Sequence, residues 1–117
     1  MPGGNAGDYQ RVGLAFTKAL ATRDYDAAYA LTSRDYRNGT SVKALEAAFE
    51  RIVPVDWKTV GPIEVGKTME DWPGRELSDV GWAYLSVGGD LYSEAVTVVV
   101  TREEGELKVR TVEFGRP

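Results

Sequence analysis

The side chains able to do chemistry in this chain are carboxylates, tyrosines and lysines, because its 117 residues include no histidine and no cysteine. Without histidine, the usual general base near neutral pH and the commonest transition-metal ligand are missing. Without cysteine, disulfides, thiolate nucleophiles and thiolate metal sites are excluded. Acid–base chemistry would therefore depend on Asp, Glu, Tyr or Lys side chains. We expect no cofactor and no metal site.

Glu94 is the strongest candidate for a catalytic carboxylate. It shares a predicted strand face with Tyr92 and a row of valines, where a buried carboxyl group would suit general acid or base chemistry. Asp56, beside Trp57 at the start of the first predicted strand, is the second candidate. Both have a simpler interpretation, because a Glu near a strand end is usually solvated or paired and a loop Asp often caps the chain.

Aromatic side chains are numerous for a domain of this size, with three Trp, six Tyr and three Phe. Aromatic rings with polar tips suit a pocket that holds an apolar ligand by a few hydrogen bonds. They also suit an ordinary core, which is the better interpretation for Trp82 and Tyr29. Trp72, in a Trp-Pro-Gly loop, suits a lid or an interface. The residues expected to line a pocket are Phe16, Tyr29, Trp57, Tyr84, Tyr92 and Glu94.

Charge and composition limit the partners. The chain has 18 acidic and 14 basic residues, a net charge of −4, and no segment that concentrates Lys and Arg. Nucleic acids and anionic membranes require clustered positive charge, so neither is an expected partner. Residues 1–7 lack the features of a signal peptide, and no apolar run is long enough to span a bilayer. We expect a cytoplasmic protein with a flexible tail over residues 1–7 and one domain over residues 8–117.

The elements that position these side chains change type midway along the chain. Apolar residues recur every three or four positions in three stretches of the first half, which predicts helices over residues 9–20, 25–32 and 42–52. Their expected N-caps are Asp8, Asp24 and Ser41. Residues 33–40 are expected to form a loop.

From residue 56 onward the pattern is that of strands. Strands are predicted over residues 56–65, 80–87, 91–101 and 107–114, with a hairpin at residues 88–90. Residues 69–79, around Trp72-Pro73-Gly74, are expected to be rich in turns. Helices followed by an antiparallel meander predict an α+β fold, with N-terminal helices packed on one face of a curved antiparallel sheet.

The strand over residues 91–101 is apolar on both faces. A sheet with one face in water alternates more cleanly, and the helices can cover only one face. We therefore expect a homodimer packed through the sheet. The alternative is that β-branched residues simply suit strands. The two rows are Val96, Val98 and Val100 on one face, and Ala95, Thr97 and Val99 on the other.

Residues 16–20 end a predicted helix with an aromatic residue, and residues 23–29 form a turn with Asp24 and a second short helix. This pattern, the helix after Ser41 and the closing pair of long strands resemble the nuclear transport factor 2-like (cystatin-like α+β) superfamily. The resemblance implies a cone-shaped cavity between the helices and the concave face of the sheet, and commonly a dimer across the sheet.

The catalytic patterns of that superfamily do not carry over to this sequence. Phe16 stands where the ketosteroid isomerase branch has a tyrosine, so the hydroxyl donor is missing. The dehydratase branch and many cyclases depend on histidine. The epoxide hydrolase branch uses an Arg-x-Asp pair, which is absent from residues 80–87 and 91–101.

Three functions are compatible with these features, because a fold by itself does not determine activity. The first is a small-molecule-binding domain with a hydrophobic cavity between helices and sheet, which would take a small hydrophobic ligand. The second is an isomerase, cyclase or hydrolase that uses carboxylate and Tyr chemistry, with Glu94 or Asp56 as the base. The third is a protein-interaction module, of adaptor or immunity type, acting through its sheet or the Trp72 loop. The missing catalytic patterns favour a role without catalysis.

Overall fold

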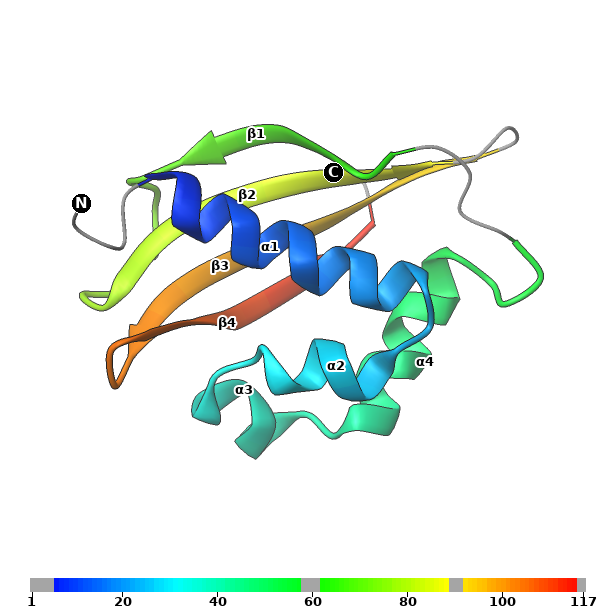
Figure 1. Ribbon diagram of the computed structural model, residues 1–117, viewed down its shortest axis with the longest axis horizontal. Helices are drawn as coiled ribbons and strands as arrows, with labels where there is room; N and C mark the ends of the chain where they lie inside the picture. Colours follow the sequence, from blue (N-terminus) through cyan, green and yellow to red (C-terminus); the bar gives the residue numbers. More distant parts are fainter. Residues whose placement is uncertain (1–5, 58–61, 89–91, 116–117) are drawn as a thin grey trace.

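The fold is an α+β arrangement in which helices pack on one face of an antiparallel sheet, as the sequence predicts. The computed structural model describes residues 6–57, 62–88 and 92–115, and these form four helices and four strands. α1 (Ala6–Ala21) lies along the sheet, and α2 (Tyr25–Ala30), α3 (Arg34–Gly39) and α4 (Val42–Ile52) gather together beside it (Figure 1). Within the described residues, no helix is long and apolar enough to cross a membrane.

The four strands follow one another in the sheet in the same order as in the chain. They are β1 (Glu64–Met69), β2 (Asp79–Gly88), β3 (Ser93–Glu103) and β4 (Glu106–Phe114), and each pairs antiparallel with the next. The last three strands were predicted to within a few residues. The predicted hairpin at residues 88–90 lies mostly outside the described residues.

Local capping explains where three helices begin. The side chains of Asp24, Ser33 and Ser41 each accept a hydrogen bond from a backbone N–H in the first turn of the helix that follows, which satisfies a donor without a partner in the helix. The predictions for Asp24 and Ser41 are confirmed. The predicted cap at Asp8 is wrong, because α1 already begins at Ala6. Of the predicted flexible tail, residues 6 and 7 are helical and residues 1–5 lie outside the described residues.

Two other predicted boundaries are wrong. Residues 33–40 were expected to form a loop, but the Ser33 cap allows a short helix, α3, in which Gly39 is the last residue. The first strand was predicted over residues 56–65. Instead Asp56 and Trp57 lie in a turn after α4, and β1 begins only at Glu64. Residues 58–61 of that prediction lie outside the described residues.

The core lies between the helices and one face of the sheet. α1 approaches β2 closely because Gly81 has no side chain: a Cβ atom there would lie 2.3 Å from the ring of Tyr9. Fully burying a large apolar side chain contributes about 1.5–3 kcal/mol, so this layer holds helices and sheet together. The core side chains, each at most 1% exposed, are Tyr9, Phe16, Leu20, Ala28, Leu45, Phe49, Val53, Ala83, Leu85, Val87, Val96, Val98, Val100 and Val109.

The opposite face of the sheet, which we call the outer face, carries the second row of β3. The alternation predicted for β3 is confirmed, and Trp82, expected to be an ordinary core residue, lies on the outer face instead, half-buried between β3 and solvent. Val99 has Trp82 of β2 on one side and Thr111 of β4 on the other. The outer row of β3 is Ala95, Thr97, Val99 and Thr101, which are 0%, 8%, 7% and 6% exposed.

This row is therefore buried within a single chain. The larger side chains of the neighbouring strands, such as Trp82, stand beside the small residues of β3 and cover them. Contacts within one chain therefore account for the apolar residues on both faces of β3, without a second copy of the chain. The homodimer through the sheet is therefore not needed to explain this pattern, and a single chain does not test that prediction from sequence.

Candidate functional site

A tight turn brings one tryptophan over the outer face. Trp72-Pro73-Gly74-Arg75 has proline at its second position, a φ of +90° at Gly74 and a hydrogen bond from the N–H of Arg75 to the carbonyl oxygen of Trp72, 3.2 Å long. These are the features of a type II β-turn, which requires a positive φ at the third position and therefore favours glycine there. The predicted turn at Trp72 is confirmed.

A pocket of about 310 Å³, open to solvent on one side, lies between the turn and the sheet. Its floor is the outer row of β3, and its sides come from β2 and β4. It combines two indole rings with threonine hydroxyls and charged groups, the mixture that fixes a small ligand by a few directed contacts. We call it the outer pocket; it is lined by Trp72, Pro73, Gly74, Trp82, Thr97, Val99, Arg110, Thr111 and Glu113.

One wall of the outer pocket is fixed by an ion pair between Arg110 and Asp79. The Nε and Nη2 atoms of Arg110 donate to the two carboxylate oxygens of Asp79, at 2.8 and 2.6 Å. The Asp79 side chain is 0% exposed and that of Arg110 is 17% exposed. A bidentate pair of this kind restrains both side chains. The guanidinium therefore presents a fixed edge to the pocket.

Two β-bulges make this pair possible. Between β2 and β3 the register shifts beside Val80, and between β3 and β4 it shifts beside Arg110. An extra residue in one strand reverses the face on which the neighbouring residues lie. Asp79 consequently pairs with Thr101 on the outer face, although strict alternation would place it on the same face as Gly81.

The same carboxylate also anchors the loop that carries Trp72. The backbone N–H of Glu76 donates to Asp79 Oδ2 at 2.8 Å, and the Nη2 atom of Arg75 donates to the Asp79 carbonyl oxygen at 2.7 Å. The Arg75 guanidinium lies 6.0 Å from the centroid of the Trp72 ring. Loop and sheet are thus linked through Asp79.

Ionisation of this pair follows from its contacts. Burial opposes the charge on Asp79, but the hydrogen bonds from Arg110 and from the Glu76 N–H, with the positive charge of Arg110, outweigh it and lower the pKa of Asp79. The hydrogen bond to Asp79 raises the pKa of Arg110. Both groups are therefore charged at neutral pH.

A smaller hollow of about 150 Å³ adjoins the outer pocket and shares Arg110 with it. Its rim is acidic, with Asp35, Glu76 and Glu103 around Arg102 and Arg110. Across residues 6–57, 62–88 and 92–115, no three acidic side chains lie close enough together to hold a metal ion. The outer pocket is the better site for a ligand because it is larger and holds both indoles.

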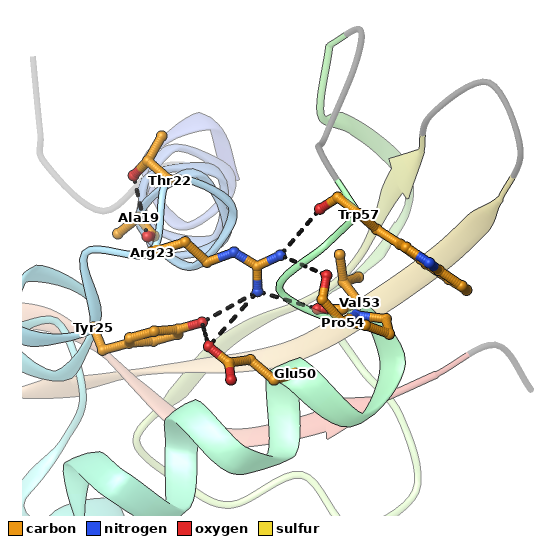
Figure 2. A network of polar contacts seen from close by, with 8 residues as sticks. All are labelled: Ala19, Thr22, Arg23, Tyr25, Glu50, Val53, Pro54 and Trp57. Atoms are coloured by element: carbon orange, nitrogen blue, oxygen red, sulfur yellow. Dashed lines mark hydrogen bonds and ion pairs between the residues drawn. The ribbon is translucent and has the colours of Figure 1, made fainter.

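A second polar network lies at the far end of α1, and its role is structural. Arg23 has a φ of 64° and ends the chain reversal after α1. Figure 2 shows its guanidinium aimed at the end of α4, where it donates to the carbonyl oxygens of Val53, Pro54 and Trp57 at 3.1, 3.1 and 3.2 Å. Helix ends leave carbonyl groups without partners, and Arg23 satisfies them.

The remaining contacts of this network join α2 to α4. The Tyr25 hydroxyl accepts from Arg23 and donates to Glu50 Oε2 at 2.7 Å (Figure 2). Burial raises the pKa of Tyr25 despite the opposing effect of Arg23. Arg23 also lies 5.2 Å above the Phe49 ring. The Arg23 guanidinium thus contacts carbonyl oxygens, a hydroxyl, a carboxylate and a ring, and the network holds α1, α2 and α4 together.

The residues predicted to line a pocket do not all meet in one place. Phe16 is fully buried in the core. Tyr29 is half-buried, and its hydroxyl donates to the carbonyl oxygen of Thr40 at 2.8 Å. Tyr84 lies on the outer face of β2, opposite the face that packs on the helices. These three residues expected around an inner cavity are thus divided among the core, the helices and the outer face, and no residue of that predicted set lines the outer pocket.

The structure does bring Trp57 and Tyr92 together, with ring centroids 5.0 Å apart. Glu94 is half-buried near the start of β3, on the face of Val96. Asp56 is exposed in the turn after α4. The two candidate bases thus lie apart from the outer pocket.

Sequence reasoning missed Asp79, Arg110 and Glu113. The available signal was a charged residue at or inside an apolar run: Asp79 directly precedes the run at residues 80–87, and Arg110 interrupts the run at residues 107–114. Such residues mark a β-bulge or an ion pair. The sequence does not show that Arg110 pairs with Asp79, which lies 31 positions earlier.

Comparison of the chain with protein-family models, curated proteins and solved structures finds no match. Its function must therefore be inferred from its own site.

Proposed function

We propose that this chain is a small-molecule-binding domain whose site is the outer pocket. The observation that carries the proposal is an open surface pocket of about 310 Å³ bounded by two indole rings and a fixed guanidinium. This volume lies at the small end of the range for ligand sites. A ligand with one flat or compact apolar part and one or two polar groups would fill it.

The rigidity of the surroundings supports this proposal. The floor belongs to the central strands, and the Trp72 loop is tied to the sheet by the Asp79 contacts. A site whose groups are already held in place loses little entropy when it binds. The hydroxyls of Thr97 at the floor and of Thr111 at one side offer both donors and acceptors.

The chain's three tryptophans allow a direct test. The indole N–H signals of Trp57, Trp72 and Trp82 are assigned with single Trp→Phe variants in a ¹⁵N correlation spectrum. Benzyl alcohol, benzylamine and benzoate are then titrated as neutral, cationic and anionic probes with one ring in common. We expect at least one probe to shift the signals of Trp72 and Trp82 and to leave that of Trp57 in place. If these three probes, and also choline and its neutral analogue 3,3-dimethylbutan-1-ol, all leave the signals of Trp72 and Trp82 unmoved, the proposed function is wrong.

The proposal keeps the class of function predicted from sequence and moves its site. The nuclear transport factor 2-like resemblance remains a proposal based on element order. A cytoplasmic location also remains a proposal, based on the composition of residues 1–7 and the lengths of the apolar runs. The cavity implied by that resemblance would have to open among core side chains such as Phe16 and Leu85, which are 0% exposed.

A protein-interaction module is the second candidate, and exposed apolar side chains favour it. Leu77 is 92% exposed in the loop that carries Trp72, and Val55 and Trp57 are 66% and 44% exposed in the turn after α4. A photoreactive residue placed at Val55, with one at Lys43 as the control, tests this candidate in the cells that make the protein. A discrete adduct from position 55 alone would support it.

A further inference from the structure

Among the described groups that line the outer pocket or contact its walls, the carboxylates of Asp79, Glu76 and Glu113 outnumber the guanidiniums of Arg110 and Arg75. The pocket is lined by one cation, Arg110, and one acid, Glu113. Arg110 is already matched by Asp79 and also lies 3.3 Å from a carboxylate oxygen of Glu76. Glu113 is exposed and, among the described residues, takes part in no ion pair. A cationic ligand would therefore meet an unmatched carboxylate, and an anionic one would meet a neutralised guanidinium.

The two indoles of the pocket strengthen the same preference. The face of a tryptophan ring carries negative electrostatic potential and attracts cations more strongly than the rings of tyrosine and phenylalanine do. Trp72 already has one such neighbour, the Arg75 guanidinium at 6.0 Å from its centroid. Among the described residues, no cation lies over Trp82. The ring of Trp82, at the border of the pocket, is thus free to receive one from a ligand.

We propose that the outer pocket recognises a small organic cation, with an alkylated or primary ammonium group between the indoles and Glu113. This inference rests on the proposed function and gives its ligand a chemical class. An ammonium group carrying methyl or methylene groups suits such a site, because it offers apolar surface together with a diffuse positive charge. The Thr97 and Thr111 hydroxyls suit a hydroxyl or ether group on the same ligand.

The charge itself is tested with choline and 3,3-dimethylbutan-1-ol, which have nearly the same shape and differ in the positive charge. Binding is followed by the Trp72 and Trp82 indole signals and by calorimetry. We expect choline to bind about tenfold more tightly than the neutral alcohol, since a desolvated cation–π contact is worth more than 1 kcal/mol. Among the ring probes, benzylamine should bind more tightly than benzyl alcohol, and benzoate should bind least.

Two variants locate the recognition. Glu113 is exposed, so Glu113→Gln should keep the fold. It should weaken choline binding several-fold and leave the affinity for the neutral alcohol unchanged. Trp82→Leu keeps an apolar wall without the ring and should remove most of the preference for choline. Glu64→Gln is the matched control, because Glu64 is exposed in β1. It should leave the affinities for choline and for the neutral alcohol unchanged.

The possible failures are distinguishable. If the neutral alcohol binds as tightly as choline, or if only neutral or anionic ring probes shift Trp72 and Trp82, the cation inference is wrong and the proposed function stands. If no probe of either series shifts these signals, both are wrong. A preference for choline that Glu113→Gln leaves intact would contradict the assigned role of Glu113.

Discussion

At the scale of single residues, Asp79 does more than any other side chain to shape the candidate site. Its carboxylate accepts from Arg110 and from the Glu76 N–H, and its carbonyl oxygen accepts from Arg75. Removing one partner of a buried ion pair leaves the other charge without compensation, which costs several kcal/mol. The sheet, the Trp72 loop and the wall of the pocket should all depend on this one carboxylate.

Asp79→Asn should lower the free energy of unfolding by about 3 kcal/mol at pH 7. The folded-state pKa of Asp79 is lowered from about 3.8, so its stabilising effect is fully present above that pH and is lost as the pH falls through the folded-state pKa. The deficit of the variant should therefore shrink in acid, because protonation removes the same charge from the native protein. Urea unfolding monitored by circular dichroism from pH 7 down to pH about 2.5 measures it.

Asp71→Asn is the matched control, since Asp71 is exposed in the same loop. It should leave stability within about 0.5 kcal/mol of the native value, as exposed substitutions usually do. A deficit for Asp79→Asn that stays constant across the pH range would show that ionisation of Asp79 does not stabilise the fold.

At the scale of elements, the sequence predicts those features that depend on nearby residues. Asp24 and Ser41 each cap a helix through a backbone N–H three positions away, and the apolar period of α4 follows from its own residues. Even α3, predicted as a loop, begins with the local cap of Ser33. Such contacts can be read from a short window.

The outer pocket is different because its residues come from the turn after β1, from β2, from β3 and from β4. Strict alternation, the rule used to assign faces from sequence, fails at the bulges beside Val80 and Arg110. A shift of one residue moves every following side chain to the other face. Trp82 and Thr97 could be assigned to one face of the sheet, but their meeting with Arg110 depends on a register that only the structure supplies.

The contact of α1 with β2 provides a test at this scale. Gly81→Ala should lower the free energy of unfolding by about 2 kcal/mol or more. The new Cβ atom would lie 2.3 Å from ring atoms of buried Tyr9 and would overpack the core. Thermal and urea unfolding measure the change. Gly39→Ala is the control, since a Cβ atom there meets nothing within 4 Å.

The double variant Tyr9→Leu/Gly81→Ala separates this clash from a general effect of alanine in β2. If the clash is responsible, the second substitution should cost much less in the Tyr9→Leu background than in the native one, which a double-mutant cycle records as a coupling energy. Additive effects of the two substitutions would contradict the close approach of α1 to β2.

At the scale of the whole molecule, the homodimer predicted from sequence and the outer pocket would use the same face. A dimer packed through the outer face would cover Trp82 and the Trp72 loop. The row that motivated the dimer, from Ala95 to Thr101, is already at most 8% exposed within one chain. A second copy would therefore bury little further apolar surface on that row, and burial of apolar surface is what stabilises most dimers.

We therefore expect sedimentation velocity at micromolar concentrations to give the mass of one chain, 12.8 kDa. Tyr84→Lys, which places a charge on the outer face beside the pocket, should leave that mass unchanged. If the native chain instead sediments at twice this mass and Tyr84→Lys returns it to one chain, the dimer occupies the outer face. Ligand probes would then compete with self-association, and saturating choline should shift the native protein towards the monomer. A dimer that neither the substitution nor the probe affects must form through another surface, which leaves the outer pocket accessible to ligand.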